Sequence, residues 1–148
     1  MQRKRRTNRY AEMSRRHQKE FNEFPKVFAF NQEDALKKLD VPSDGSDEIC
    51  SFGDTGCYYR KCDAPAFQKM LDRQRRERED AVRSDRTGSG FIYDMFSCVL
   101  ANQEFAFTFS IEDTLDYLGY TRQEVLESKA LLNGLNKALK KYGVVFEG

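Results

Sequence analysis

Apolar side chains in this chain concentrate in one stretch, residues 88–108. Within it they recur at helical spacing, so they share one face of a helix. They are Phe91, Ile92, Met95, Phe96, Val99 and Leu100. No other part of the sequence is as well suited to anchor a core. The pattern therefore predicts a buried central helix that starts after Gly90.

The segments before this helix alternate between helical and extended patterns. Asn8, a preferred capping residue, precedes an apolar stripe that predicts a helix over residues 9–22. Runs of β-forming residues bounded by turn signals predict strands that could form a three-stranded sheet. These strands are expected at 26–30, 48–52 and 57–60, and further helices at 32–39, after the cap Asn31, and from Asp63 to about Ser84.

The segments after the central helix carry clear capping signals. Thr121 and Glu124 have the spacing of a capping box, in which each side chain bonds the other residue's backbone. The expected elements are an extended piece at 106–109, a helix at 111–118 between Ser110 and Gly119, and a helix from Thr121 to about Tyr142. Residues 144–146 are either an edge strand or a packed tail.

These elements predict an α+β fold. We expect one small, mainly antiparallel β-sheet packed against about five helices in a single domain over residues 10–148. Residues 1–9 form a flexible basic arm in this prediction.

Charge is spread unevenly along the chain. The formal net charge is only +1, yet the first 19 residues hold eight basic side chains and one acidic one, Glu12. The basic residues are Arg3, Lys4, Arg5, Arg6, Arg9, Arg15, Arg16 and Lys19. A basic arm on a mildly acidic body indicates a polyanionic partner, either nucleic acid or an acidic protein surface. The alternative is a solubilising tail.

A second charged run covers residues 72–80. Several opposite charges there are four residues apart, such as Asp72 and Arg76, and such pairs stabilise an exposed helix face. We interpret the run as a solvated, self-paired surface, with a partner contact as the alternative.

No targeting or membrane segment is expected. No stretch approaches 18 apolar residues, and the charged N-terminus is not followed by an apolar region. We therefore expect a soluble cytoplasmic protein that contacts no membrane and whose four cysteines are reduced thiols.

Signals for catalysis are weak. The one histidine, His17, has no nucleophile nearby in the sequence. Among Cys50, Cys57 and Cys62, only Cys57 and Cys62 come near the C-x2–4-C spacing of a zinc knuckle, and no fourth ligand lies close in the sequence. Asp54 lies in a DTG triplet, which resembles the aspartic protease motif but fits a hairpin turn better. We expect that the protein is not an enzyme and binds neither a metal nor a cofactor. A hydrolase that uses Asp54 or the cysteines is the least favoured hypothesis.

Two predicted helices, 111–118 and 122–142, are joined as briefly as in a helix-turn-helix. A DNA-reading second helix should start with exposed polar or basic residues, and Arg122 and Gln123 fit this. Glu124 and Glu127 would repel phosphate, however. A packed helix pair is favoured, and DNA reading stays as the alternative.

The later residues resemble a small family of uncharacterised proteins from gut Gram-positive bacteria, their phages and conjugative elements. The similar segments are GFIYDMF from Gly90, LAN with Glu104, EDTL from Glu112 and LGYT from Leu118. The resemblance extends over most of the chain, from Phe24 to Leu139. It implies an accessory gene of a mobile element, and such proteins often inhibit host defences, as anti-CRISPR proteins do.

We hypothesise that the chain is a non-enzymatic mobile-element protein that binds and inhibits a bacterial defence complex. The expected partner is an RNA-guided nuclease or its guide RNA or DNA. Many such inhibitors are acidic DNA mimics, whereas this chain is near neutral with a cationic arm. Blockade of the protein or capture of nucleic acid therefore fits better than mimicry. The runner-up is a nucleic-acid-binding regulator that uses the arm and the C-terminal helix pair.

Overall fold

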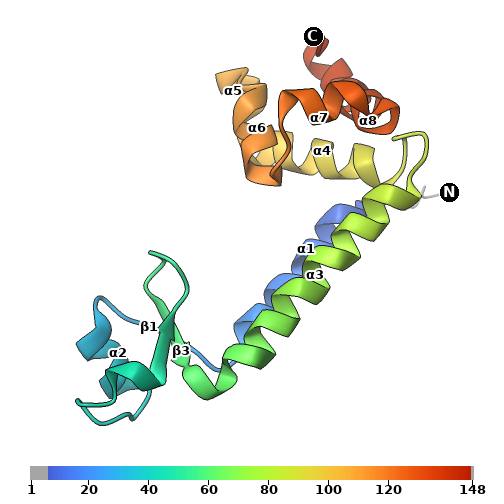
Figure 1. Ribbon diagram of the computed structural model, residues 1–148. Helices are drawn as coiled ribbons and strands as arrows, with labels where there is room; N and C mark the ends of the chain where they lie inside the picture. Colours follow the sequence, from blue (N-terminus) through green and yellow to red (C-terminus); the bar gives the residue numbers. More distant parts are fainter. Residues whose placement is uncertain (1–6, 148) are drawn as a thin grey trace, which may run out of the picture. The chain divides into compact units, whose positions relative to one another are not determined.

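The computed structural model describes residues 7–147 and confirms the α+β class. Within this range the α-helices number eight rather than about five (Figure 1). They are α1 (Arg9–Glu23), α2 (Gln32–Lys38), α3 (Ala64–Ser84), α4 (Phe91–Asn102), α5 (Phe105–Thr108), α6 (Ile111–Leu118), α7 (Arg122–Glu127) and α8 (Lys129–Leu139). The strands are β1 (Val27–Phe28), β2 (Ile49–Ser51) and β3 (Cys57–Arg60), and short 3-10 helices are η1 (Ser46–Glu48), η2 (Lys61–Asp63) and η3 (Lys140–Tyr142).

Residue contacts divide the chain into two compact units. Among the described residues, the first unit combines 7–17 with 77–147, and the second covers Gln18–Arg76. The single domain over residues 10–148 stays a prediction.

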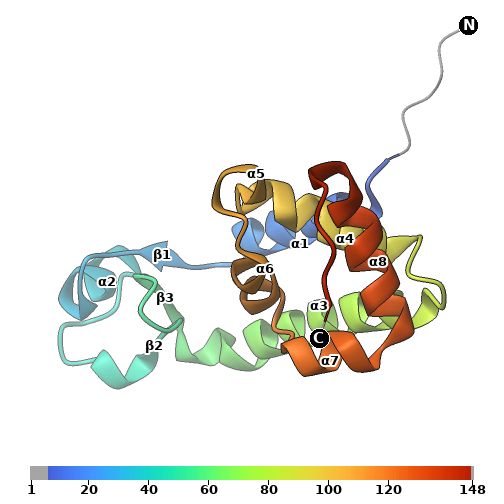
Figure 2. The same cartoon turned by 90° about the horizontal axis from the view of Figure 1, so that it is seen from above.

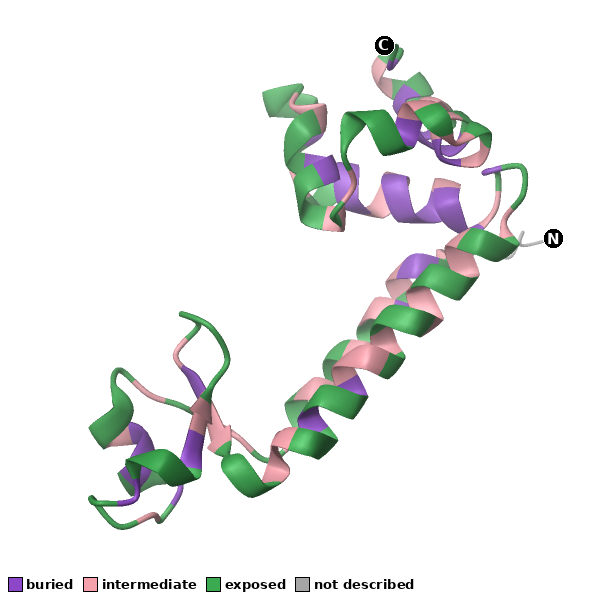
Figure 3. Cartoon of the chain, viewed as in Figure 1, coloured by how far each residue is buried: buried purple, intermediate pink, exposed green. Residues whose placement is uncertain are grey.

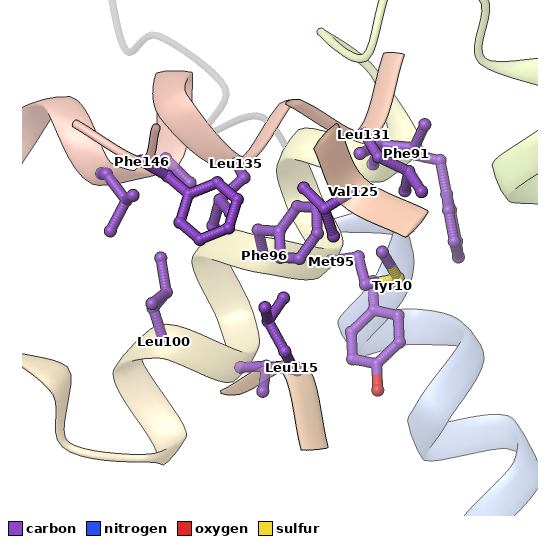
Figure 4. Close-up of a cluster of buried hydrophobic side chains, with 14 of the residues drawn as sticks. Tyr10, Phe91, Met95, Phe96, Leu100, Leu115, Val125, Leu131, Leu135 and Phe146 are labelled. Atoms are coloured by element: carbon purple, nitrogen blue, oxygen red, sulfur yellow. The ribbon is translucent and has the colours of Figure 1, made fainter. Parts of the chain in front are cut away.

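The core of the first unit is built on α4, as the hydrophobic pattern predicts. Seven of its residues are buried, and Phe96 and Leu100 are fully enclosed. Helices α5, α6 and α8 contact α4, and α7 contacts α8 (Figure 2). Buried positions run along α4 in Figure 3, and Figure 4 shows Phe96 among side chains from α7 and α8.

Helix α4 begins under a cap that lies outside its own sequence. Gly90 precedes the helix and has no side chain to bond the free backbone amides. The carboxylate of Asp85 instead accepts hydrogen bonds from the backbone N–H groups of Gly88, Gly90 and Ile92, each at 3.0 Å. One aspartate therefore binds the loop before the central helix and accepts a hydrogen bond from a backbone N–H group of the first helical turn.

The C-terminal segment is a packed tail rather than a strand. Phe146 is 3% exposed, and its backbone N–H donates to Asn136 Oδ1 at 2.7 Å. Asn136 Nδ2 donates back to the carbonyl of Phe146 at 3.2 Å. One side chain of α8 thus satisfies both backbone groups of the tail residue.

The prediction of an extended piece at residues 106–109 is wrong, because the structure has α5 there. Glu104 and Phe109, on either side of α5, have left-handed backbone angles, with φ of 55° and 51°. These turns fold the chain back so that Phe105 is buried against Phe109 and Tyr142. Tertiary packing overrides the local β-propensity at this point.

The prediction of one helix from Thr121 to about Tyr142 is also wrong. The chain is extended at Ser128, with φ −107° and ψ 113°, and the Ser128 hydroxyl caps α8 by accepting from the N–H of Leu131. Serine favours this capping position over a helix interior. The Thr121 and Glu124 capping box is confirmed at the start of α7.

The second unit holds the sheet. Strand β3 pairs antiparallel with β1 on one side and β2 on the other, so the predicted hairpin and three-stranded sheet are confirmed. Strand β1 is shorter than the predicted 26–30. Helix α2, capped by Asn31 as predicted, buries Ala35 and Leu36 in a small cluster with Ile49 of β2.

A separate aromatic cluster in this unit surrounds Phe67 of α3, which is 2% exposed. Its ring contacts those of Phe21, Phe24, Phe52 and Tyr59. This cluster of the second unit is thus built from aromatic rings, in contrast to the aliphatic cluster around Ala35 and Leu36.

Candidate binding surface on the first helix

The basic residues singled out in the sequence fall into two groups. Arg3, Lys4, Arg5 and Arg6 lie outside the described residues. Arg9, Arg15, Arg16 and Lys19 lie on α1, and all four are exposed. Their spacings of three, four and seven residues put them on one side of the helix. We call Arg9, Arg15 and Arg16, which belong to the first unit, the basic face of α1.

The other side of α1 is held in the core. Tyr10 and Met13 are buried, and the Tyr10 ring meets Phe91 of α4 edge to face at 6.0 Å between centroids. Because these residues fix the rotation of the helix, the basic face points to solvent. The apolar stripe predicted from the sequence is confirmed here.

The N-terminus of α1 is bonded to the first turn of α4. Asn8 Oδ1 accepts from the N–H of Ala11 at 2.8 Å, which confirms the predicted cap. Asn8 Nδ2 donates to the carbonyl of Asp94 at 2.8 Å, and the backbone N–H of Arg9 donates to Asp94 Oδ2 at 3.1 Å. Asp94 is 4% exposed, so a buried carboxylate anchors the end of the helix that carries Arg9.

One arginine of the basic face is paired within the protein. Glu77 of α3 accepts from Arg16 Nη2 at 2.6 Å and lies 3.0 Å from His17 Nε2. The hydrogen bonds from Arg16 and His17 lower the pKa of Glu77. The single histidine therefore lies in a hydrogen-bonded cluster with Arg16 and Glu77.

The charged run 72–80 is less self-contained than predicted. Arg75 pairs with Asp72 within α3 at 3.3 Å, in line with a self-paired surface. Glu20 of α1, however, accepts from Arg73 and Gln74. Part of the run thus bonds a neighbouring helix in the second unit.

All four cysteines are free thiols in the structure. Cys57 is buried and Cys62 is exposed, and burial raises the pKa of Cys57 and of Cys98. Raised pKa values leave less reactive thiolate at neutral pH. Within residues 7–147, no three His, Cys, Asp or Glu side chains are grouped closely enough to hold a metal ion.

Asp54 lies at the tip of the β2–β3 hairpin. Gly53 and Gly56 on either side have φ of 56° and 76°, and the Thr55 hydroxyl donates to the carbonyl of Phe52 at 2.6 Å. These are the contacts of a turn. The DTG triplet is explained by this geometry.

In the C-terminal helix pair, the two residues considered for DNA reading, Arg122 and Gln123, make contacts within the protein. Arg122 pairs with Glu112 at 2.5 Å and stacks over the Phe146 ring at 4.6 Å. Gln123 donates to Glu127 at 2.6 Å. Because α7 has only six residues, it offers less than two turns to a groove.

Sequence reasoning missed Arg78, Asp85 and Asp94. Asp85 and Asp94 act through contacts with backbone groups that no sequence pattern marks. Arg78 lies in the charged run but is half-buried, next to Tyr10 and Tyr117. No feature of the sequence distinguishes Arg78 from the other charged residues of the run.

The sequence matches the model of a protein family over residues 9–141, and the chain belongs to that family, described as a family of unknown function (DUF7659). Neither a curated protein nor a solved structure matches it significantly. None of the helices within residues 7–147 has the length and apolar character needed to cross a bilayer.

Proposed function

We propose that this protein is a non-catalytic binding protein of a mobile element that blocks a bacterial defence complex, with the basic face of α1 as its contact surface. The observation that carries the proposal is that Arg9, Arg15 and Arg16 are exposed on a helix whose opposite side is anchored by Tyr10 and Asp94. A preorganised row of guanidinium groups suits phosphates and carboxylates.

The carboxylates that the first unit buries or partly buries support a binding role over catalysis. Asp85 and Asp94 accept backbone hydrogen bonds at helix starts, and Glu77 is paired with Arg16 and His17. A general acid or base must be free to exchange a proton with a substrate, whereas the oxygens of these carboxylates are engaged in hydrogen bonds within the fold. These groups stabilise the fold instead.

The choice of an RNA-guided nuclease as the target rests on charge and on the resemblance to mobile-element proteins. Such a complex presents guide and target phosphates together with charged protein surfaces. A chain of net charge +1 with cations gathered at one end matches an anionic surface better than it mimics DNA.

A DNA-binding regulator is the competing function. It would keep the basic face of α1 but needs a second element for base readout. The contacts of Arg122 with Glu112 and Phe146 leave the C-terminal helix pair poorly suited to that task.

A plasmid-interference assay tests the proposal. Cells with an RNA-guided nuclease and a targeted plasmid are transformed with or without the protein, and protected transformants are counted. We expect the protein to restore transformation and the triple variant Arg9→Gln, Arg15→Gln, Arg16→Gln to lose most of this protection. A control that removes three other exposed cations, Arg86→Gln, Lys129→Gln, Lys140→Gln, should retain it. Absence of protection against a panel of such nucleases would refute the proposal.

A further inference from the structure

A small hollow in the first unit lies between α1, α3 and α6. It is lined by Tyr10, Arg78, Tyr117 and Leu118 and has a volume of about 130 Å³. Pockets for drug-sized ligands and cofactors usually measure about 300–1,000 Å³. The hollow therefore has room for one small polar group and not for an organic cofactor.

Arg78 is the charged group of the hollow and has no counter-ion among the described residues. Several other charged residues of α3 have one: Glu77 pairs with Arg16, Arg75 with Asp72, and Arg83 with Asp80. Arg78 is half-buried, which removes part of its hydration. A partly desolvated guanidinium without a carboxylate partner attracts an anion from solution.

The two tyrosines of the hollow carry hydroxyl groups that can donate hydrogen bonds beside this charge. Burial raises the pKa of Tyr10, so its phenol keeps the proton at neutral pH. Tyr117 is 64% exposed and contributes its side chain from α6 at the mouth of the hollow. A guanidinium flanked by phenolic O–H groups forms the charge-assisted bonds that oxyanions accept.

Two acidic residues lie in the neighbourhood and limit what can bind. Burial raises the pKa of Tyr120, and the negative charges of Glu124 and Glu79 raise it further. Neither carboxylate lines the hollow. They disfavour a long polyanion running past this point more than a single anionic group held by Arg78.

We propose that this hollow binds a single oxyanion, a phosphate or carboxylate group, through Arg78 with Tyr10 and Tyr117 as hydroxyl donors. The site is separate from the basic face of α1. A lone anionic group, such as a terminal phosphate or a side-chain or C-terminal carboxylate, fits its size.

Titration of the full chain with inorganic phosphate and with acetate, followed by amide NMR, tests this inference. Ionic strength is held constant with sodium chloride, so that only specific binding changes the spectrum. We expect saturable shifts in the amides around Tyr117 and Leu118 with at least one anion, and the tighter anion identifies a phosphoryl or a carboxylate ligand. Absence of saturation with both anions, or equal shifts with chloride alone, would overturn the site.

Variants separate the hollow from general charge effects. Arg78→Gln should weaken binding at least about tenfold, as expected for loss of a charge-assisted bond. Arg76→Gln removes an exposed charge from the same helix and should leave binding unchanged. Tyr117→Phe keeps an exposed ring and removes only the hydroxyl, so it tests the site even if Arg78→Gln does not fold, and it should weaken binding several-fold. Undiminished binding in both Arg78→Gln and Tyr117→Phe would rule out the proposed contacts.

Discussion

The backbone N–H of Arg9 donates to the buried carboxylate of Asp94 across 85 positions of sequence, at 3.1 Å. The first residue of α1 and the first turn of α4 are thus joined by a hydrogen bond to a charged group. Such bonds contribute more to stability than bonds between neutral groups. This contact holds in place the helix that carries the basic face.

Replacing Asp94 by alanine should therefore lower the free energy of unfolding by about 1–3 kcal/mol, because a helix start loses its acceptor in a buried place. Urea unfolding followed by circular dichroism measures the loss. Asp116→Ala removes an exposed aspartate of α6 and is the matched control, expected to change stability by less than about 0.5 kcal/mol. Equal stability of Asp94→Ala and the wild type would show that Asp94 does not anchor α1.

Stability should fall in acid through Asp85. Burial by itself would raise the pKa of this carboxyl, but the bonds from the backbone N–H groups of Ile92, Gly88 and Gly90 outweigh it and hold the pKa below its ordinary value. The folded state therefore binds the proton less readily than the unfolded chain. The stabilisation is complete above the ordinary aspartate pKa and is lost as pH falls through the lowered one.

The pH dependence can be assigned to Asp85 by comparing the wild type with Asp85→Asn in melting experiments from neutral to strongly acidic pH. The variant should be less stable at neutral pH, and the gap between the two should narrow in acid. A gap that stays constant or widens toward low pH would contradict this role of Asp85.

Helices α4 and α8 approach closely at Gly134, which is buried. A Cβ atom there would meet Cγ2 of Ile92 and lie 2.7 Å from the carbonyl oxygen of Gly88. Gly134→Ala should thus destabilise the protein by about 1–3 kcal/mol through overpacking, although alanine is the better helix former. Asn133→Ala, at an exposed position of the same helix, should be neutral or slightly stabilising. A gain in melting temperature for Gly134→Ala would mean that α4 and α8 are not this close.

Glu104 has a left-handed backbone, which is unfavourable for a residue with a side chain by roughly 1–2 kcal/mol. Glu104→Gly should relieve this strain and stabilise the protein by about 0.5 kcal/mol, after the larger entropy loss of glycine on folding is included. Ala101→Gly, an exposed position of α4, should instead destabilise by about 1 kcal/mol. Chemical denaturation distinguishes the two, and destabilisation by both would remove the argument for strain at Glu104.

Local patterns predicted much of this fold. The apolar spacing of α4, the caps at Asn31 and Ser110 and the box at Thr121 and Glu124 depend on residues close in sequence, where propensity and hydrogen bonding act directly. The hairpin that joins β2 and β3 follows from turn residues for the same reason.

Other features depend on partners far along the chain. Residues 106–109 are helical because Phe105 is buried against Tyr142, and their β-forming composition gives no sign of this. Arg78 belongs to a charged run whose pattern predicts a solvated helix face. In the structure it lines a hollow together with Tyr10 and Tyr117, which lie on other helices. The structure shows that Arg9, Arg15, Arg16 and Lys19 are exposed, while their role in binding stays a prediction.

Capture experiments test the central claim, that the basic face of α1 engages a defence complex. We would immobilise the full chain, a version lacking residues 1–6, and the triple variant of Arg9, Arg15 and Arg16. Each is exposed to a purified RNA-guided nuclease complex, with and without prior digestion of its nucleic acid. We predict that the full chain retains the complex after treatment, that the triple variant loses most of it, and that the truncation shows how much the preceding cations add. Equal capture by the full chain and the triple variant would contradict the account, and capture that disappears with the nucleic acid would identify a nucleic-acid binder instead.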